Sequence, residues 1–498
     1  MTALERTAGA AINAAQADGL VGVIDIGSNS VRLVVFEDGA RSPDYVFNEK
    51  VICGLGRGLA ETGRLDEEAK PLTRATLRRH VALARRMGVG ELLIFGTAAL
   101  REAEDGPEFR ETVEAELNAP IRVLTGREEA RLSAEGVLFG WPAARGVVAD
   151  MGGASLELAS VADGEVTAMV STPAGHLRLL DAESPTTRRS LLALGAAAAS
   201  FVAEPKRLII VGGAWRALAK AGMTRTNYPF PVLQGYEMAP DEALALCEWA
   251  ISEPAAAIKR AAGVSTARIA SLAAGARALR RLVSDLRPES VEVSAFGVRE
   301  GVLYERMSPE LRRQEPLIAA AEAMELRGAR FPGFGRELFA WMKPILEGFT
   351  ADRVRLAEAT CLLHDVNWRA HPDFRVSACF GTVSRANLGG VGHRGRLFLG
   401  AALSHRYKGQ LHPHEAAALD RLAPDARRDA EIVGRAIRLG AMVSGSTPGT
   451  LGQCALRLEE GALILDFAPE AADFAGERVQ QRLEALAQAM GRAAALNL

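Results

Sequence analysis

Two short segments of the chain place an aspartate near the end of an apolar run and follow it with small and hydroxyl residues. The first is Val23-Ile24-Asp25-Ile26-Gly27-Ser28-Asn29-Ser30, and the second is Val147-Val148-Ala149-Asp150-Met151-Gly152-Gly153-Ala154-Ser155. A glycine-rich turn lets backbone N–H groups approach phosphate oxygens, and an aspartate at a strand end can hold a divalent cation. Two copies of this pattern predict two lobes that close on one phosphorylated ligand.

The elements that position the first segment read as an α/β lobe. Five apolar runs bounded by turn residues predict strands at 21–25, 31–37, 46–53, 92–95 and 121–124. An amphipathic helix is expected from Asp66 to about Met87, and further helices separate and follow the later strands. Strands that alternate with helices in this way indicate a sheet covered by helices.

The second segment begins a repeat of the same order of elements. Strands are expected at 147–150, 156–161, 166–171, 208–211 and 291–294. We therefore predict a duplicated ribonuclease-H-like architecture, with the functional site in the cleft between the two lobes.

After about Ser308 the pattern becomes mostly helical. The stretch Cys361-Leu362-Leu363-His364-Asp365 is typical of an HD-like fold, but no histidine occurs between His176 and His364, so we favour a scaffold without a metal site. A hairpin over 456–467 and a final amphipathic helix form a small C-terminal α+β segment. The predicted organisation is an N-terminal extension (1–19), lobe I (20–140), lobe II (141–307) and the HD-like helical domain with its C-terminal hairpin and helix (308–498).

Composition narrows the class of protein. The 498 residues are 48% hydrophobic and 24% charged, with a formal net charge of −2, which gives no overall attraction to nucleic acid or membrane. The five cysteines are scattered and have no CxxC spacing, as expected of reduced cytosolic thiols. The apolar stretch 191–203 is shorter than a spanning helix, and Glu5, Arg6 and Asn13 interrupt the N-terminal segment. A cytoplasmic protein is expected.

Five segments, taken in order, make the chain similar to a known family. They are Asp25-Ile26-Gly27-Ser28-Asn29-Ser30, Gly96-Thr97-Ala98-Ala99-Leu100-Arg101, Gly126-Arg127-Glu128-Glu129-Ala130-Arg131, Asp150-Met151-Gly152-Gly153-Ala154-Ser155-Leu156-Glu157 and Gly301-Val302-Leu303-Tyr304. The chain resembles the exopolyphosphatase and guanosine pentaphosphate phosphohydrolase family of the actin, heat-shock-70 and sugar-kinase superfamily. The resemblance is close over about residues 20–306 and looser in the helical region.

This resemblance implies hydrolysis of a phosphoanhydride bond with Mg²⁺ as cofactor. Glu129 matches the family's catalytic glutamate and would be the general base, with Arg101 and Thr97 in the same catalytic group. Asp150 would bind Mg²⁺, helped by Asp25 or Glu157. The residues that would hold the terminal phosphates are Gly27, Ser28, Asn29, Ser30, Arg32, Gly152, Gly153, Ala154 and Ser155. A homodimer formed through the helical domain is also expected.

Several arginines lie beside these turns. Arg57, Arg178 and Arg299, together with Arg32 and Arg101, could form a local basic track despite the acidic net charge. For each one alone, however, ordinary surface charge is the interpretation that we favour.

Four functions fit these residues. The first is an exopolyphosphatase that removes terminal orthophosphate from inorganic polyphosphate, and the second is a guanosine pentaphosphate 5′-phosphohydrolase with the same machinery. The third is a kinase or ATPase of the superfamily, which would need a purine pocket near 212–216, where Trp215 and Arg216 are bulky. The fourth is a sensor that binds polyphosphate or nucleotide without turnover. The ordered set of motifs favours the first.

Overall fold

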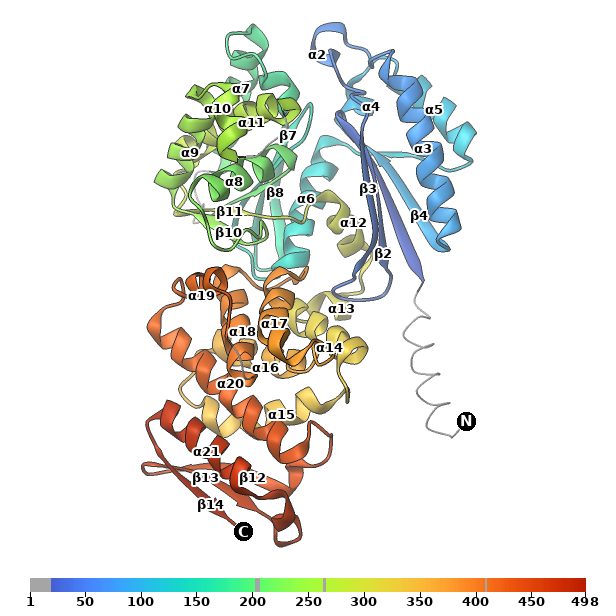
Figure 1. Cartoon of the computed structure of the whole chain (residues 1–498). Helices are drawn as coiled ribbons and strands as arrows, with labels where there is room; N and C mark the ends of the chain where they lie inside the picture. Colours follow the sequence, from blue (N-terminus) through green and yellow to red (C-terminus); the bar gives the residue numbers. More distant parts are fainter. Residues whose placement is uncertain (1–18, 202–206, 263–265, 408–409) are drawn as a thin grey trace. The chain divides into compact units, whose positions relative to one another are not determined.

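The computed structural model describes residues 19–498 except 202–206, 263–265 and 408–409 (Figure 1). The chain forms two compact units, Met1–Arg313 and Gln314–Leu498. The N-terminal extension expected over 1–19 lies, apart from Gly19, outside the described residues. Within those residues, no helix combines the length and the apolar character needed to cross a membrane.

The first unit begins with a five-stranded sheet in the order β3-β2-β1-β4-β5. Its strands are β1 (Leu20–Ile26), β2 (Ser30–Glu37), β3 (Tyr45–Ile52), β4 (Val89–Gly96) and β5 (Arg122–Val123). The strands β1, β2 and β3 form an antiparallel meander. Strand β4 pairs with β1 in parallel, and β5 pairs with β4 in parallel. Helices α3 (Ala69–Arg86) and α5 (Gly106–Leu117) lie along this sheet (Figure 1), and α2 (Leu59–Thr62) and α4 (Ala98–Glu102) are short.

The second sheet repeats this topology and adds one strand. Its order is β10-β11-β9-β6-β7-β8, in which β6, β7 and β8 are antiparallel and β9 and β11 are parallel. The bounds are β6 (Gly146–Met151), β7 (Leu156–Ala162), β8 (Glu165–Thr172), β9 (Arg207–Val211), β10 (Tyr236–Met238) and β11 (Ser290–Val293). Its outer core is shared with α7 (Pro185–Ala198), α8 (Gly213–Arg225), α9 (Pro240–Ser252), α10 (Ala255–Ala262) and α11 (Thr266–Leu286).

Two helices, α6 (Gly126–Gly140) and α12 (Val298–Arg306), pack between the two sheets (Figure 1). Leu132 of α6 shares a core with the first sheet, and Val137 shares a core with the second. The two helices approach backbone to backbone, because a Cβ at Gly136 would lie 2.0 Å from the Gly297 carbonyl oxygen and one at Gly301 1.8 Å from that of Leu132. The unit ends with α13 (Pro309–Arg313).

The second unit is helical and closes with a small sheet. Its helices are α14 (Pro316–Gly328), α15 (Phe334–Met342), α16 (Ala351–Leu363), α17 (Arg375–Arg385), α18 (His393–Arg406), α19 (Pro413–Leu419), α20 (Pro424–Ser444) and α21 (Glu477–Met490). The sheet has the order β12-β13-β14, with β12 (Cys454–Glu459), β13 (Ala462–Phe467) and β14 (Ala493–Asn497). Helix α21 packs against α20 and against this sheet.

The residues that suggested an HD-like fold have protein partners in this unit. His364 is buried, and its Nδ1 lies 2.7 Å from the Cys361 carbonyl oxygen. Both oxygens of Asp365 accept hydrogen bonds from Arg330, at 2.7 and 2.9 Å. This arrangement joins α16 to the segment after α14 through a bidentate ion pair.

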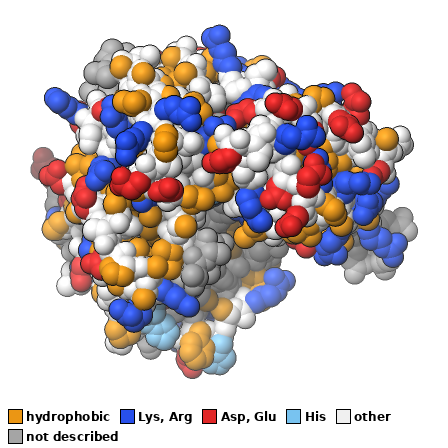
Figure 2. Space-filling view, turned by 90° about the horizontal axis from the view of Figure 1, so that it is seen from above, with side chains coloured by type: hydrophobic (Ala, Val, Ile, Leu, Met, Phe, Trp, Pro, Cys, Tyr) orange, Lys and Arg blue, Asp and Glu red, His pale blue; other side chains and the backbone are white. Residues whose placement is uncertain are grey.

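The two α/β lobes, the helical region and the C-terminal hairpin agree with the predicted fold class. Two strands escaped prediction, β10 and β14. Strand β10 has only three residues, and β14 consists largely of alanine, so neither has a residue pattern typical of a strand. All five cysteines are buried and unpaired. On the face drawn in Figure 2, acidic and basic side chains are interspersed, in keeping with the small net charge.

The contact of α6 with α12 generates a first prediction. Gly301→Ala places a methyl group where the Leu132 carbonyl oxygen lies, so the helices must separate, and we expect the free energy of unfolding of the first unit to fall by about 1–3 kcal/mol. Denaturant unfolding followed by circular dichroism measures this change. Gly213→Ala is the control, because its Cβ would meet no described atom within 4 Å. Equal stability of the two variants would contradict the prediction.

Candidate active site

The two glycine turns predicted from sequence have the same local structure. After β1, the Gly27 N–H donates to the Ser30 carbonyl oxygen at 3.0 Å, and after β6 the Gly152 N–H donates to that of Ser155, also at 3.0 Å. Each turn therefore joins a parallel-sheet strand to its antiparallel neighbour in the same way. The duplication seen in sheet topology extends to single hydrogen bonds.

The two turns face each other within the first unit. A Cβ built on Gly153 would lie 2.8 Å from the Ser28 Cβ and 3.5 Å from the Asn29 nitrogen. The backbone N–H groups of Ser28, Asn29, Gly153 and Ala154 donate to no acceptor in the described part of the chain, and the buried Ser28 Oγ likewise has no partner there. Successive backbone N–H groups of a turn form an anion-binding concavity, and a phosphate group would accept hydrogen bonds from several of these donors at once.

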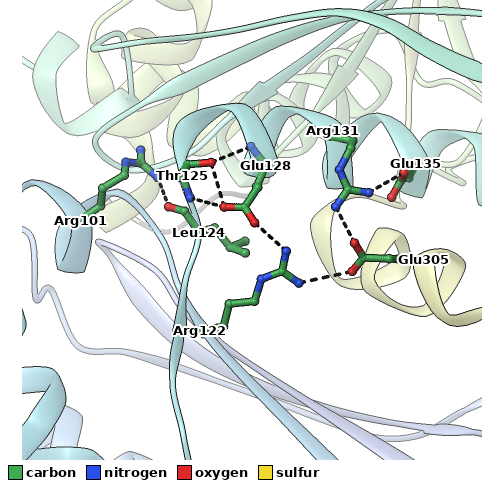
Figure 3. A network of polar contacts seen from close by, with 8 residues as sticks. All are labelled: Arg101, Arg122, Leu124, Thr125, Glu128, Arg131, Glu135 and Glu305. Carbon is green, nitrogen blue, oxygen red and sulfur yellow. Dashed lines mark hydrogen bonds and ion pairs between the residues drawn. The ribbon is translucent and has the colours of Figure 1, made fainter.

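The start of α6 is fixed by polar contacts, which Figure 3 shows from close by. Thr125 caps the helix, because its Oγ1 accepts from the Glu128 N–H at 3.2 Å while Glu128 Oε2 accepts from the Thr125 N–H at 2.9 Å. Arg122 donates to Glu128 at 2.7 Å. Further along the helix, Glu305 of α12 pairs with Arg131 at 2.5 Å. With Glu128 held in the cap, Glu129 is left to point inward, and it is 6% exposed.

Glu129 has the electrostatics expected of a general base that works near neutral pH. Burial raises its pKa from 4.5 to about 7, the charges of Asp150 and Asp25 add to this rise, and Arg101 opposes it. Arg101 donates to Glu129 Oε2 at 2.9 Å and to the Leu124 carbonyl oxygen at 2.8 Å. The structure therefore brings together the two residues that the sequence proposed as base and as phosphate-neutralising cation.

Two more carboxylates lie in the same buried region. The hydroxyl of Ser133 donates to Asp150 at 2.5 Å, and that of Ser171 donates to Glu157 at 2.8 Å. Burial raises the pKa of Asp150, and burial together with the charges of Glu129 and Asp150 raises that of Glu157 well above its usual value. These carboxylates repel one another, so a divalent cation among them would relieve an unfavourable interaction.

This set of carboxylates fits Mg²⁺ bound partly through water. Oxygen ligands are those that Mg²⁺ prefers, and it usually keeps several waters beside one or two carboxylates and substrate phosphates. No group of three or more His, Cys, Asp and Glu side chains among the described residues is arranged to hold a metal by itself. Asp150 could hold the ion, with Glu157 and Asp25 acting directly or through water.

Three partly buried arginines form a cluster beside these carboxylates. Arg299 donates to Asp25 Oδ2 at 2.7 Å, and its side chain is 14% exposed. Arg216 donates to the Ala295 carbonyl oxygen at 2.9 Å. Burial and the charges of Arg299 and Arg216 lower the pKa of Arg32 to about 10. The interpretation of Arg299 as ordinary surface charge was wrong, since it is held in the interior by Asp25.

The other arginines near the turns differ in role. Arg178 donates to the Ala154 carbonyl oxygen at 3.0 Å and to Glu102 at 2.7 Å, so it braces the second turn against the first lobe. Arg57 is 69% exposed and lies 3.8 Å from Asp66, which agrees with surface charge. Thr97 is buried at the start of α4, and its N–H donates to the Ile26 carbonyl oxygen at 3.2 Å beside the first turn.

Two hydroxyl residues of the site escaped prediction, Ser133 and Ser171. Ser133 lies four residues after Glu129, and residues at this spacing share one face of a helix. That spacing was the signal that could have revealed it. Ser171 faces Glu157 as its cross-strand partner in the β7–β8 pair, a register that the sequence alone did not fix.

Fold and site together define a two-lobed enzyme of the actin-like class, in which the two glycine turns face each other between the lobes. Residues 7–310 match the model of the Ppx/GppA phosphatase family, and residues 317–497 match that of the exopolyphosphatase C-terminal domain. The chain belongs to the Ppx/GppA phosphatase family, whose members are hydrolases.

Named relatives agree with this assignment. The chain is 27% identical over 309 residues to exopolyphosphatase 1 of Mycobacterium tuberculosis, covering 58% of this chain and 89% of that protein. It is 28% identical over 315 residues to exopolyphosphatase 1 of Mycobacterium leprae, covering 58% and 90%. The crystal structure of an exopolyphosphatase from Cytophaga hutchinsonii shares the fold, with a TM-score of 0.51 and 22% identity over 58% of this chain and 97% of that chain.

The environment of Glu129 generates a prediction about stability. Because its pKa is raised to about 7, the folded chain binds this proton more tightly than the unfolded chain does. The stability that Glu129 contributes is full below pH 4.5 and is lost as the pH rises through about 7. We expect the wild-type free energy of unfolding, relative to that of Glu129→Gln, to fall by about 1–3 kcal/mol between pH 5 and pH 8.

Its neighbour supplies the control for this experiment. The Arg122 side chain and the Thr125 backbone lower the pKa of Glu128 to about 2, so its contribution is lost only as the pH falls from 4.5 toward 2. The difference in the free energy of unfolding between wild type and Glu128→Gln should therefore stay constant from pH 5 to pH 8. Parallel pH profiles for the two variants would show that burial does not perturb Glu129.

Proposed function

We propose that this protein is an exopolyphosphatase that hydrolyses terminal orthophosphate from inorganic polyphosphate. The observation that carries the proposal is the pair of facing turns, whose unpartnered amides adjoin a buried glutamate with a pKa of about 7. A terminal phosphoryl group would accept hydrogen bonds from the turn amides and from Ser28. The arginine cluster would neutralise the phosphates that follow it.

Hydrolysis needs a general base that takes a proton from the attacking water. A carboxylate oxygen of Glu129 would take a proton from a water whose oxygen attacks the terminal phosphorus. The bond from that phosphorus to the bridging oxygen breaks, which releases orthophosphate and a chain one unit shorter. Arg101 would hold Glu129 in position and stabilise the charge that spreads over the phosphoryl oxygens. Mg²⁺ at Asp150, when bound, would supply further charge neutralisation.

The region around Gly212 favours phosphate over a purine. Trp215 is fully buried, and its indole N–H donates to the Gly275 carbonyl oxygen at 2.8 Å, so its side chain belongs to the core. Arg216 belongs to the arginine cluster. Superfamily kinases bind adenosine at this position. Here the position holds the Trp215 side chain, which packs in the core, and the positively charged Arg216 side chain. A repeating phosphate chain suits that charge better than a nucleoside does.

Substrate choice tests the proposal directly. We expect phosphate release to be fastest from long polyphosphate when it is compared side by side with guanosine pentaphosphate and ATP. Glu129→Gln should lower this rate at least about 100-fold, whereas Glu128→Gln should stay within a few-fold of wild type. Faster release from guanosine pentaphosphate would assign the second hydrolase function. Transfer from ATP to an acceptor would assign a kinase, and full activity of Glu129→Gln would remove it as the base.

The metal assignment has its own test. Asp150→Asn keeps the contact with Ser133 but removes the charge, so we expect the Mg²⁺ concentration for half-maximal rate to rise at least about tenfold, or activity to be lost. Asp163→Asn is the control, because Asp163 is exposed and pairs with Arg145. An Mg²⁺ titration of Asp150→Asn that overlays that of wild type would exclude Asp150 from the metal site.

A further inference from the structure

A second site rich in arginine lies within the C-terminal unit. It is a cavity of about 260 Å³ formed where the end of α18 meets α20 and α21. Its lining residues are Ser404, His405, Tyr407, Arg435, Arg438, Arg482 and Ala485. Two of these helices, α20 and α21, therefore direct guanidinium groups toward one cavity.

The positive charge of this cavity is only partly balanced. Arg435 pairs with Glu431 at 2.7 Å, whereas Arg438 and Arg482 have no ion pair among the described residues. Arg406 precedes the lining residue Tyr407, and its guanidinium lies 4.7 Å from the centre of that ring. Burial and the charges of Arg482, Arg406 and Arg435 lower the pKa of Arg438. Like charges this close to one another favour an anion between them.

One guanidinium donor of the lining also lacks an acceptor. The Nε atom of Arg482 is shielded from solvent and has no hydrogen-bond partner in the described chain. A buried donor left unpaired is destabilising, and one bonded to a charged oxygen is among the stronger hydrogen bonds in proteins. An anion with several oxygens would accept a hydrogen bond from this donor and would also balance the positive charge of the lining arginines.

We propose that this cavity binds a compact phosphate anion with two or more negative charges, of the size of inorganic pyrophosphate. Arginine binds phosphate through paired N–H donors, so a group of arginines suits this ligand. Clefts that hold drug-sized ligands measure roughly 300–1,000 Å³, and the cavity lies just below that range. The site is built only from the second unit and uses no residue of the catalytic cradle. It does not depend on the function proposed above.

Hydrogen–deuterium exchange of the full chain tests this site, with pyrophosphate as the probe and Mg²⁺ omitted. We expect slower exchange in the peptides that carry Arg435, Arg438 and Arg482. In the double variant Arg438→Gln with Arg482→Gln, the pyrophosphate concentration for half-maximal protection should rise at least tenfold. Arg478→Gln is the matched control, because Arg478 is exposed one turn earlier on α21 and does not line the cavity. It should behave as wild type.

The location of the protection decides the outcome. The proposal is overturned if pyrophosphate slows exchange only in peptides of the first unit. It is also overturned if the double variant shows the same protection by pyrophosphate as wild type. Protection by long polyphosphate or by GDP without protection by pyrophosphate also overturns it, since the ligand is then a polymer or a nucleotide. Circular dichroism checks that the variants are folded. If the double variant does not fold, the single variant Arg438→Gln replaces it, and we expect that variant to weaken pyrophosphate binding at least about threefold.

Discussion

The close packing of α6 against α12 is the constraint on which the candidate active site depends. Gly136 and Gly301 let the two backbones touch, and any side chain at either position would collide with a carbonyl oxygen of the other helix or of its first residues. Glu129 lies in the first turn of α6 and Arg299 in the first turn of α12, so this contact places the Glu129 carboxylate and the guanidinium that pairs with Asp25 in one region. Because each helix also packs on a sheet, the same contact fixes where the two turns meet.

Some charges of the candidate active site are paired without any ligand, Glu129 with Arg101 and Asp25 with Arg299, while others lie among charges of the same sign. The charges of Glu129 and Asp150 raise the pKa of Glu157, while the charges of Arg299 and Arg216 lower the pKa of Arg32. A phosphate chain with a divalent cation offers the opposite charge to each group. Binding would therefore relieve repulsion within both sets, and a neutral ligand would relieve neither.

The sequence predicted the elements that follow simple periodicity, and it missed what depends on tertiary contact. The two Asp-containing turns and the strands on either side of them rely on local residue patterns, and all were found. Arg299 was misjudged because its spacing resembles that of a surface helix residue, and only the fold brings it to Asp25. Ser171 was missed because cross-strand register decides its contact with Glu157. Residue type indicated the chemistry, whereas burial and partners had to come from the structure.

The duplicated scaffold supports two different uses of the same residue. Asp25 and Asp150 are the next-to-last residues of equivalent strands, before turns with the same hydrogen bond, yet Asp25 forms an ion pair with Arg299 whereas Asp150 accepts a hydrogen bond from the hydroxyl of Ser133. An ion pair consumes most of the capacity of a carboxylate to attract a cation, while a hydroxyl donor leaves its charge intact. The first copy is thus suited to orienting an arginine, and the second to binding a cation. Divergence of the partners, rather than of the turns, makes the symmetric cradle asymmetric.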